Sequence, residues 1–365
     1  MRVTPDQLRP GCLLLNHVKG KTAHPIISKD TVLTAEHIHV LKRFLIEEVN
    51  VSPKLASGER FIPKPSSSQK KKIVESVKES TLAKESFDEH YLKTVDYFKT
   101  VFKEWQLNVP IDMVNIRKQL IPLLNRINEL KDRIFTLHQY ANTDNYIYHH
   151  CVSVGLLSAF LAKQMDYPES EWLQVGLAGA LSDSGMSKVN ENILHKSNSL
   201  TEKESEKIKS HPVYSYRLIE NSPLMTQAAK TAVLQHHERR DGSGYPIGLK
   251  GHKIQPYAQI IAVCDSYHAM TCDRYFQSKT SPFLVVEELE TEQFTRLDPF
   301  VVQSFKQSIA HFSIGTKVKL SNAEQAEIIF TDSNQPTRPM VKLLSSGEIL
   351  PLKDMPDVHI LEVLS

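Results

Sequence analysis

The sequence LQHHERRDGSGYPIGLKG, residues 234 to 251, places two adjacent histidines directly before a glycine-rich turn. His236 and His237 close an apolar run with helical spacing. The turn that follows contains Gly242, Gly244, Tyr245 and Pro246. Glycine adopts positive φ without a steric penalty and proline restricts the exit direction, so the turn should hold the imidazoles beside a rigid loop. Taken alone, the stretch also fits an ordinary helix end with two exposed histidines, so it indicates a site only where further ligands converge on it.

The composition is that of a globular chain with little net charge. Its 365 residues suffice for two or three domains, and 41% hydrophobic and 24% charged residues are ordinary values. The net charge of +2 gives no electrostatic case for a nucleic acid polymer or a membrane surface as partner. Four cysteines without a CxxC pair, and the lack of a signal peptide and of an apolar run of about 18 residues, predict a cytoplasmic protein without a membrane span.

The hydrophobic pattern divides the chain into four segments. Residues 1–62 contain short strand patterns and one helical pattern, which predict a small α+β module. Residues 63–140 begin with PKPSSSQKKK, a linker or an exposed loop, and continue as amphipathic helix. Residues 141–310 are predicted to be all-helical, and residues 311–365 return to strand patterns that predict a small β module. The predicted fold class is therefore mainly α.

A heptad pattern runs through residues 113–137. Apolar residues recur there at alternating spacings of three and four, at Met113, Ile116, Leu120, Leu123, Ile127, Leu130, Ile134 and Leu137. Such residues form a seam for another helix, and Pro122 should kink or break the helix that carries them. The seam has two possible partners: the chain's own core, which its short length favours, or a second copy in a homodimer.

Six ligand-type residues lie on apolar helix faces or at their ends. They are His150, Asp183, His211, His236, His237 and Asp265, separated by 25 to 33 residues apart from the adjacent pair. That spacing corresponds to about one helix and one connection, so a bundle could bring them into one pocket. Singly, each is more commonly structural, as a core histidine bonded to a carbonyl or an aspartate capping a helix. Together, six buried polar groups must satisfy one another or bind cations.

The chemistry of this ligand set predicts a divalent metal centre. Imidazole and carboxylate ligands without thiolate favour iron or manganese, and zinc and nickel stay open. Two ions sharing one carboxylate can generate a nucleophile at neutral pH and polarise a phosphoryl oxygen, which suits phosphodiester hydrolysis.

The segment from Asp144 to about Phe305 resembles the HD-GYP proteins, bacterial cyclic di-GMP phosphodiesterases within the HD phosphohydrolase superfamily. The matching pieces are DNYIYHHCVSV at 144–154, LSDSG at 181–185, ILHKSNSLTEKE at 193–204, SHP at 210–212, HHERRDGSGYP at 236–246, CDSYHAMTCDRYF at 264–276 and LDPFVV at 297–302. The resemblance implies an all-helical HD-type bundle, flanked here by the N-terminal α+β and C-terminal β modules.

The resemblance also implies roles for individual residues. It makes the six ligand-type residues metal ligands, with Asp183 bridging two ions at the catalytic centre. It assigns Gly244, Tyr245 and Pro246 to a loop that contacts the substrate or a regulator, and Arg274 to a phosphate of the dinucleotide. Tyr146 stands where members with a third ion have a glutamate, so we expect no more than two ions.

Three positions depart from the family pattern. Ser182 replaces the histidine that should precede Asp183, which removes one ligand of one ion. Met186 replaces a lysine expected near the scissile phosphate, and His268 replaces an aspartate. Lys188 could substitute for the lost lysine, although a solvated surface lysine is the simpler interpretation.

These observations leave two principal hypotheses for function. The first is a metal-dependent enzyme, weakened by the three departures, that hydrolyses cyclic di-GMP to pGpG or GMP. The second is a catalytically degenerate protein that binds cyclic di-GMP, or a protein partner through the turn at 244–246, and signals through the heptad segment. A hydrolase of another nucleotide is a third hypothesis, which the tyrosine-proline turn disfavours. The complete set of buried ligands around His236 favours the enzyme, because such histidines are costly to bury without an ion.

Overall fold

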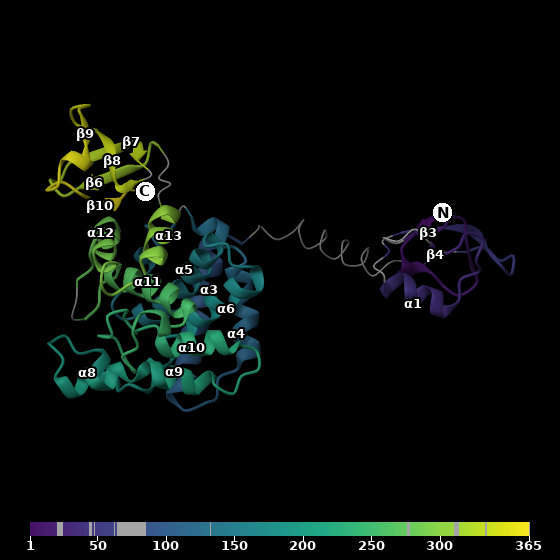
Figure 1. Cartoon of the computed structure of the whole chain (residues 1–365). Helices are drawn as coiled ribbons and strands as arrows, with labels where there is room; N and C mark the ends of the chain where they lie inside the picture. Colours follow the sequence, from purple (N-terminus) through teal and green to yellow (C-terminus); the bar gives the residue numbers. More distant parts are fainter. Residues whose placement is uncertain are drawn as a thin grey trace. The chain divides into compact units, whose positions relative to one another are not determined.

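The computed structural model describes residues 1–19, 25–43, 46, 48–61, 63, 85–131, 133–275, 278–309, 314–332 and 334–364. The chain divides into two compact units, Met1–Glu85 and Ser86–Ser365 (Figure 1). Apart from Pro63, the predicted linker at 63–72 lies outside the described residues. The domain boundaries predicted at 62, 140 and 310 stay predictions.

The first unit is a small α+β module with its own apolar core. Its three-stranded antiparallel sheet has the order β1-β5-β2, from Arg2–Val3, Val49–Leu55 and Cys12–Leu14. A second pair joins β3, Val18–Lys19, to β4, Pro25–Ile27, and the helix α1 spans Ala35–Arg43. Val49 and Val51 of β5 are buried and alternate with less buried residues, as a strand with one covered face requires. Cys12, Leu14 and Leu41 complete the core.

Helix α3, Phe87–Gln106, precedes the heptad segment. The heptad segment itself is not one continuous helix: it consists of α4, Met113–Leu124, followed by 3-10 turns at Ile127–Leu130 and Leu137–Tyr140. Pro122 lies in the last turn of α4, where its missing N–H and its ring end the helix. All eight seam residues are at most 5% exposed within the chain's own core. The alternative of packing within the chain is therefore confirmed for the seam, and a homodimer through residues 113–137 stays a prediction.

The second unit contains, besides α3, α4 and a C-terminal sheet, a helical bundle over residues 146–309. Its helices are α5, Tyr146–Gln164; α6, Glu169–Leu181; α7, Glu191–Leu194; α8, Glu202–Lys209; α9, His211–Ile219; α10, Gln227–Gln235; α11, Pro256–Thr271; α12, Pro282–Glu292; and α13, Pro299–Ile309. Short 3-10 turns lie at Ser184–Lys188 and Gly251–Lys253. Helices α5 and α6 are buried on nearly every side, because the other helices surround them (Figure 1).

A five-stranded antiparallel sheet follows the bundle and packs against it. Its order is β10-β6-β7-β8-β9, from Ile360–Val363, Lys317–Leu320, Gln325–Asp332, Gln335–Leu343 and Ile349–Pro351. A bidentate ion pair joins Arg338 of β8 to Glu287 of α12, at 2.6 and 2.7 Å. Val318 and Ile328 belong to the same apolar core as the bundle. The predicted mainly α fold, with small α+β and β modules at its ends, is confirmed.

No helix in the described part of the chain combines the length and the apolar character that crossing a membrane requires.

Candidate metal centre

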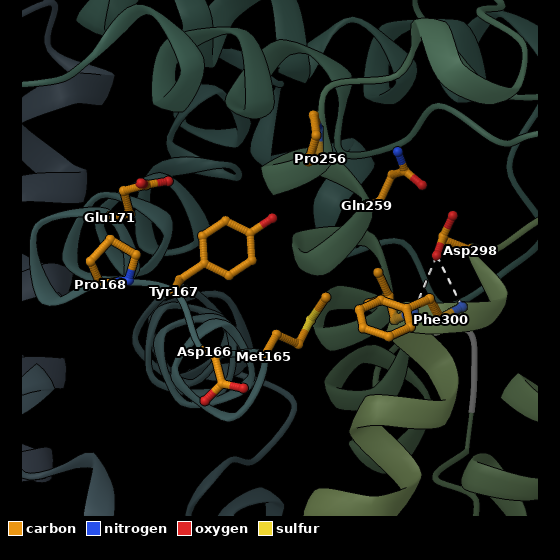
Figure 2. Close-up of a pocket in the computed structure, with 10 residues that line it drawn as sticks. Met165, Asp166, Tyr167, Pro168, Glu171, Pro256, Gln259, Asp298 and Phe300 are labelled. Atoms are coloured by element: carbon orange, nitrogen blue, oxygen red, sulfur yellow. Dashed lines mark hydrogen bonds between the residues drawn. The ribbon is translucent and has the colours of Figure 1, made fainter.

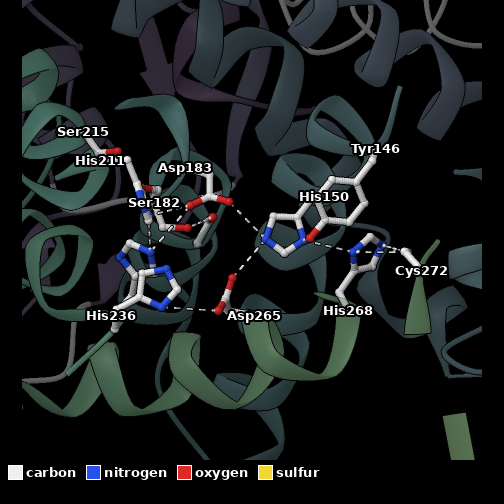
Figure 3. Close-up of polar contacts among 12 residues, drawn as sticks. Tyr146, His150, Ser182, Asp183, His211, Ser215, His236, Asp265, His268 and Cys272 are labelled. Carbon is white, nitrogen blue, oxygen red and sulfur yellow. Dashed lines mark hydrogen bonds and ion pairs between the residues drawn. The ribbon is translucent and has the colours of Figure 1, made fainter. Parts of the chain in front are cut away.

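The bundle brings all six predicted ligands together from five places in the chain (Figure 3). His150 lies on α5, His211 begins α9, and Asp265 lies on α11. Asp183 lies between α6 and the 3-10 turn at Ser184–Lys188, and His236 and His237 directly follow α10. They form two groups of ligand atoms within 4.8 Å of one another. The His211 group comprises Asp183, His211, His236 and His237, and the His150 group comprises His150, Asp183 and Asp265. Asp183 belongs to both groups, as a bridging carboxylate must.

Asp183 and Asp265 are the centre of the cluster. Asp183 lies with Oδ2 3.2 Å from Nε2 of His150 and with Oδ1 3.0 Å from Nε2 of His211. Asp265 lies with Oδ1 2.9 Å from the same Nε2 of His150 and with Oδ2 3.8 Å from Nδ1 of His237. Each carboxylate thus presents its two oxygens to two different imidazoles, although both side chains are less than 10% exposed.

A close approach of α9 sets the position of His211. A Cβ on Gly185 would lie 2.2 Å from the backbone oxygen of His211, so a larger residue there would push α9 away. The hydroxyl of Ser215 on α9 accepts a hydrogen bond from the Gly185 N–H at 2.7 Å and donates to the Ser182 carbonyl at 2.5 Å. These contacts connect the beginning of α9 to the turn that carries Asp183.

Two histidines of the His211 group have their tautomers set by the backbone. His211 donates from Nδ1 to the Ile208 carbonyl at 2.7 Å, and His236 donates from Nδ1 to the Val233 carbonyl at 2.7 Å. In the neutral rings Nε2 is then an unprotonated acceptor, and these two acceptors lie 3.2 Å apart. Oδ1 of Asp183 faces both, at 3.0 and 3.6 Å, without a hydrogen bond of good geometry. A divalent metal ion would satisfy all three of these atoms together, so the residues fit a divalent metal.

The lowered pKa values of Asp183 and Asp265 indicate that their carboxylate oxygens carry no protons. Burial opposes the charge on Asp183, but His211, His150 and His236 outweigh it and hold its pKa well below the usual value. Burial likewise opposes the charge on Asp265, and its neighbours His237 and His150 lower its pKa. Both carboxyl groups are therefore ionised at neutral pH.

The imidazoles divide into protonated and neutral rings in the metal-free chain. Burial lowers the pKa of His150, but hydrogen bonds and charge from Asp183 and Asp265 exceed that effect and raise it to about 9. Burial and the neighbouring His236 hold the pKa of His237 well below its usual value. Burial and the neighbouring His150 do the same for His268. A metal entering the His150 group must therefore displace a proton, whereas His237 already presents a free nitrogen.

The three residues that depart from the family pattern have different surroundings in the structure. Ser182 turns its hydroxyl to the Gly179 carbonyl at 2.7 Å, so it offers no ligand to the cluster. Met186 lines the cavity with an apolar side chain where the family pattern has a cation. His268 is 1% exposed, and its Nδ1 lies 3.1 Å from Nδ1 of His150.

Lys188 does not replace the lost lysine. Its Nζ donates to the Trp105 carbonyl and, at 2.9 Å, to Oδ1 of Asn108. Both acceptors lie at the end of α3, and Lys188 is not among the described residues that line the cavity. Lys188 is therefore neither a substitute for the lost lysine in the cavity nor a freely solvated side chain, because its ammonium group is bonded to acceptors at the end of α3.

A cavity of about 210 Å³ opens over the cluster. Five of the six predicted ligands line it; His236 lies behind them and is fully buried. Of the residues predicted to contact substrate, Arg274 and Tyr245 line the cavity, and Gly244 and Pro246 do not. The guanidinium carbon of Arg274 lies 5.8 Å from the centre of the Tyr146 ring. The cavity thus combines the ligand cluster with one arginine.

The loop after His237 is held by its own backbone and by a buried carboxylate. Gly242 has φ of +86°, as the turn prediction requires, whereas Gly244 is needed for space: a Cβ there would lie 2.3 Å from the Arg239 nitrogen. Glu238, only 2% exposed, accepts hydrogen bonds from the N–H groups of residues 247, 248 and 249 at 2.8, 3.2 and 2.8 Å. Tyr245 stacks on His237 with ring centres 4.7 Å apart.

Sequence reasoning missed Glu238 and the surroundings of His150. Glu238 lies between the histidine pair and the turn, and a charged residue in that position is the only signal that could have drawn attention to it. The sequence shows Tyr146 only as a residue in the place of a third-metal glutamate. In the structure its hydroxyl lies 3.0 Å from Nδ1 of His150, and its ring stacks on that imidazole. Contacts of this kind depend on side-chain directions that the helical pattern does not specify.

A larger cavity, about 480 Å³, lies where α5, α6, α11 and α13 begin or end (Figure 2). Tyr167, Glu171 and Asp298 are among its lining residues, and none of the predicted site residues is. Asp298 accepts hydrogen bonds from the N–H groups of Phe300 and Val301 and so caps α13. Of the two cavities, the one over the ligand cluster is therefore the candidate site.

Comparisons with known proteins agree with this geometry. A sequence model of the HD domain family matches residues 108–301, more than half of the chain. A cyclic di-GMP phosphodiesterase of Pseudomonas aeruginosa is 27% identical over 68% of this chain and 60% of its own length. A second cyclic di-GMP phosphodiesterase, from Thermotoga maritima, is 31% identical over 58% of this chain and 52% of its own length.

The chain spans about half to three fifths of the length of these curated relatives. Among solved structures, an HDG"Y"P protein of Bdellovibrio bacteriovorus aligns with a TM-score of 0.49 at 14% identity, covering 84% of this chain and 97% of that one. HD phosphohydrolases depend on metals, and the His/Asp cluster of this chain could bind one. The chain belongs to the HD domain family, and within it to the HD-GYP proteins.

Proposed function

We propose that this protein is a metal-dependent phosphodiesterase that hydrolyses cyclic di-GMP to pGpG or GMP. The observation that carries the proposal is the convergence of the Nε2 atoms of His211 and His236 on Oδ1 of Asp183. Such a buried arrangement is unfavourable without a cation. The relatives named as cyclic di-GMP phosphodiesterases support the choice of substrate.

We assign the metal ligands as predicted, with the His211 group and the His150 group each holding one ion and Asp183 bridging. Imidazole and carboxylate donors without thiolate favour iron or manganese. Divalent ions, when bound, lower the pKa of water and polarise a phosphoryl oxygen. The catalytic role of Asp183 is then to hold the two ions together beside the cavity.

Arg274 and the loop around Tyr245 act on the substrate in this proposal. Arg274 lines the cavity and has a planar, permanently charged group that suits a phosphate oxygen. Tyr245 lies beside His237, where it can exclude water from one side of the cluster. Gly244 and Pro246 act indirectly, by setting the path of that loop. Met186 supplies no cation, so we expect slower turnover than in a family member with lysine there.

The test is a product assay on the full chain loaded anaerobically with Fe²⁺ or Mn²⁺. Bound metal is measured by elemental analysis, and cyclic di-GMP, pGpG and GMP are separated by chromatography. The expected result is about two ions per chain and metal-dependent formation of pGpG or GMP. Arg274→Ala should raise KM or lower kcat, whereas Arg217→Ala, at an exposed position of α9 outside the cavity, should change neither. Two bound ions without any cleavage over many hours would refute the proposal.

A binding protein without turnover is the second candidate function. Ser182, Met186 and His268 favour it, because each removes a charge or a ligand that the family pattern has. Its partner would be cyclic di-GMP or a protein that docks on the loop at 244–246. Saturable binding of the dinucleotide without product would support this candidate. A homodimer through residues 113–137 would have to use side chains other than the apolar seam, which is buried in the chain's own core.

A further inference from the structure

Helix α11 contacts the His150 ring at both of its nitrogens. Asp265 lies 2.9 Å from Nε2 through Oδ1, and His268, three residues later on the same helix face, lies 3.1 Å from Nδ1 through its own Nδ1. Figure 3 shows the ring of His150 between these two side chains. Helix α11 therefore contacts the His150 ring at both nitrogens.

Hydrogen-bond chemistry determines what His268 must do when His150 is a ligand. Nε2 of His150 faces the two carboxylates, so it is the nitrogen that would bind an ion, and the ring proton must then lie on Nδ1. That proton needs an acceptor, because the site is buried. Nδ1 of His268 serves as an acceptor only if His268 carries its own proton on Nε2. The sulfur of Cys272 lies 3.7 Å from both ring nitrogens of His268, so it is within reach of that proton without selecting the tautomer.

Tyr146 is the other neighbour of Nδ1. Its hydroxyl lies 3.0 Å from Nδ1, and its ring stacks on His150 with 29° between the planes. A phenol hydroxyl can donate as well as accept a hydrogen bond, so the position of the proton on His150 decides which role Tyr146 takes. An imidazole nitrogen is a stronger acceptor than a phenol oxygen.

We propose that His268 is a positioning residue of the metal centre, which accepts the Nδ1–H of His150 and so directs Nε2 of His150 at the ion. The inference rests on the metal centre of the proposed function and adds a residue to it. His268 then supplies the orientation that a carboxylate could supply, without the negative charge. The His150 group is accordingly expected to bind its ion more weakly than the His211 group.

The test compares an acceptor with an apolar side chain at one position. His268→Asn keeps an acceptor near the place of Nδ1, and His268→Leu removes it. Each full-length variant is titrated with Co²⁺, whose visible absorption reports its ligands. We expect His268→Leu to lose about 10- to 100-fold in affinity for the weaker ion, and His268→Asn to restore most of that affinity. Affinity for the tighter ion, in the His211 group, serves as an internal control and should not change.

Nitrogen-15 NMR of the histidine-labelled wild-type chain with Zn²⁺ bound gives a measurement that needs no variant. The expected tautomers are Nδ1–H for His150 and Nε2–H for His268. A proton on Nδ1 of His268, equal affinities for Leu and Asn, or a wild-type chain that binds Co²⁺ at the His211 group alone would overturn the inference. The expected tautomers and affinities without any cleavage of cyclic di-GMP would refute the proposed function and leave this inference standing.

Discussion

The two halves of the metal centre differ in what holds their histidines. In the His211 group, His211 and His236 each donate Nδ1–H to a backbone carbonyl three residues earlier. In the His150 group, the contacts of Nδ1 of His150 within the described part of the chain are with side chains, those of Tyr146 and His268. A carbonyl of the backbone is present whatever the sequence, whereas a side-chain acceptor can be exchanged by mutation.

That difference matches where the chain departs from its family. The His211 group keeps all four ligands that the family resemblance implies. Of the three altered positions, His268 contacts His150 and Met186 lines the cavity, while the resemblance assigns the ligand lost at Ser182 to the ion of the His150 group. Ser182 offers nothing to an ion, because its hydroxyl is bonded to the Gly179 carbonyl. We infer that the half anchored by the backbone is the tighter metal site and that the other half determines whether hydrolysis is fast.

The largest effect should come from the residue that the two halves share. Asp183→Asn removes the bridging charge, so bound metal should fall from about two ions to nearly none, and hydrolysis by roughly three orders of magnitude. Elemental analysis and the product assay measure both. Asp298→Asn, which alters the cap of α13, should leave the metal content unchanged. Loss of only one ion in Asp183→Asn would mean that the halves are independent.

Restoring the family residues should make the two halves more alike. Ser182→His together with Met186→Lys adds a ligand to the His150 group and a cation to the cavity, so kcat should rise by about 100-fold. The affinity for the weaker ion should rise as well, measured by competition with a chelator. Met186→Leu is the matched control, because it changes the side chain without adding charge. An unchanged kcat in the double variant would show that the altered half does not limit turnover.

The pH dependence of metal binding should separate the halves without mutation. In the metal-free chain the pKa of His150 is raised to about 9, so an ion must displace its proton at neutral pH. Affinity of the His150 group should therefore rise about tenfold per pH unit toward pH 9 and then level off. The pKa of His237 is lowered, so that ligand of the His211 group has no proton to lose. Calorimetry in buffers of different ionisation enthalpy counts the protons released, and equal pH dependence of both ions would contradict the assignment.

The smallest effect should come from the carboxylate under the loop. Glu238→Gln replaces one acceptor oxygen by an N–H₂ group that faces a backbone N–H, which should lower the free energy of unfolding by about 1 to 3 kcal/mol. Urea unfolding measures this, and KM should rise because Tyr245 is less well held. Glu292→Gln, at a pair between Glu292 and Arg296 on the surface, should cost less than about 1 kcal/mol. Equal losses in the two variants would show that the loop does not depend on Glu238.

Much of the fold and the membership of the cluster could be predicted from the sequence, because both follow from periodicity. The helical spacing on α5, α10 and α11 places His150, His236 and Asp265 on buried faces whatever the neighbouring helices are. The strand patterns at both ends of the chain likewise predicted sheets that the structure contains. The heptad pattern left the partner of its seam open, because periodicity identifies an apolar face without identifying what covers it, and the structure shows that the chain's own core covers it.

By itself the sequence determined which ligand-type residues lie on buried helix faces and which family positions are altered, since residue identity and spacing are local properties. Only the tertiary structure decided which oxygen faces which nitrogen, that His268 contacts His150, and that Glu238 binds the backbone of the loop after His237. Those facts depend on packing between helices that are distant in the chain, as where Gly185 lets α9 approach and where α11 meets both nitrogens of His150. The direction of a side chain is set by its neighbours in space, and a linear pattern does not contain them.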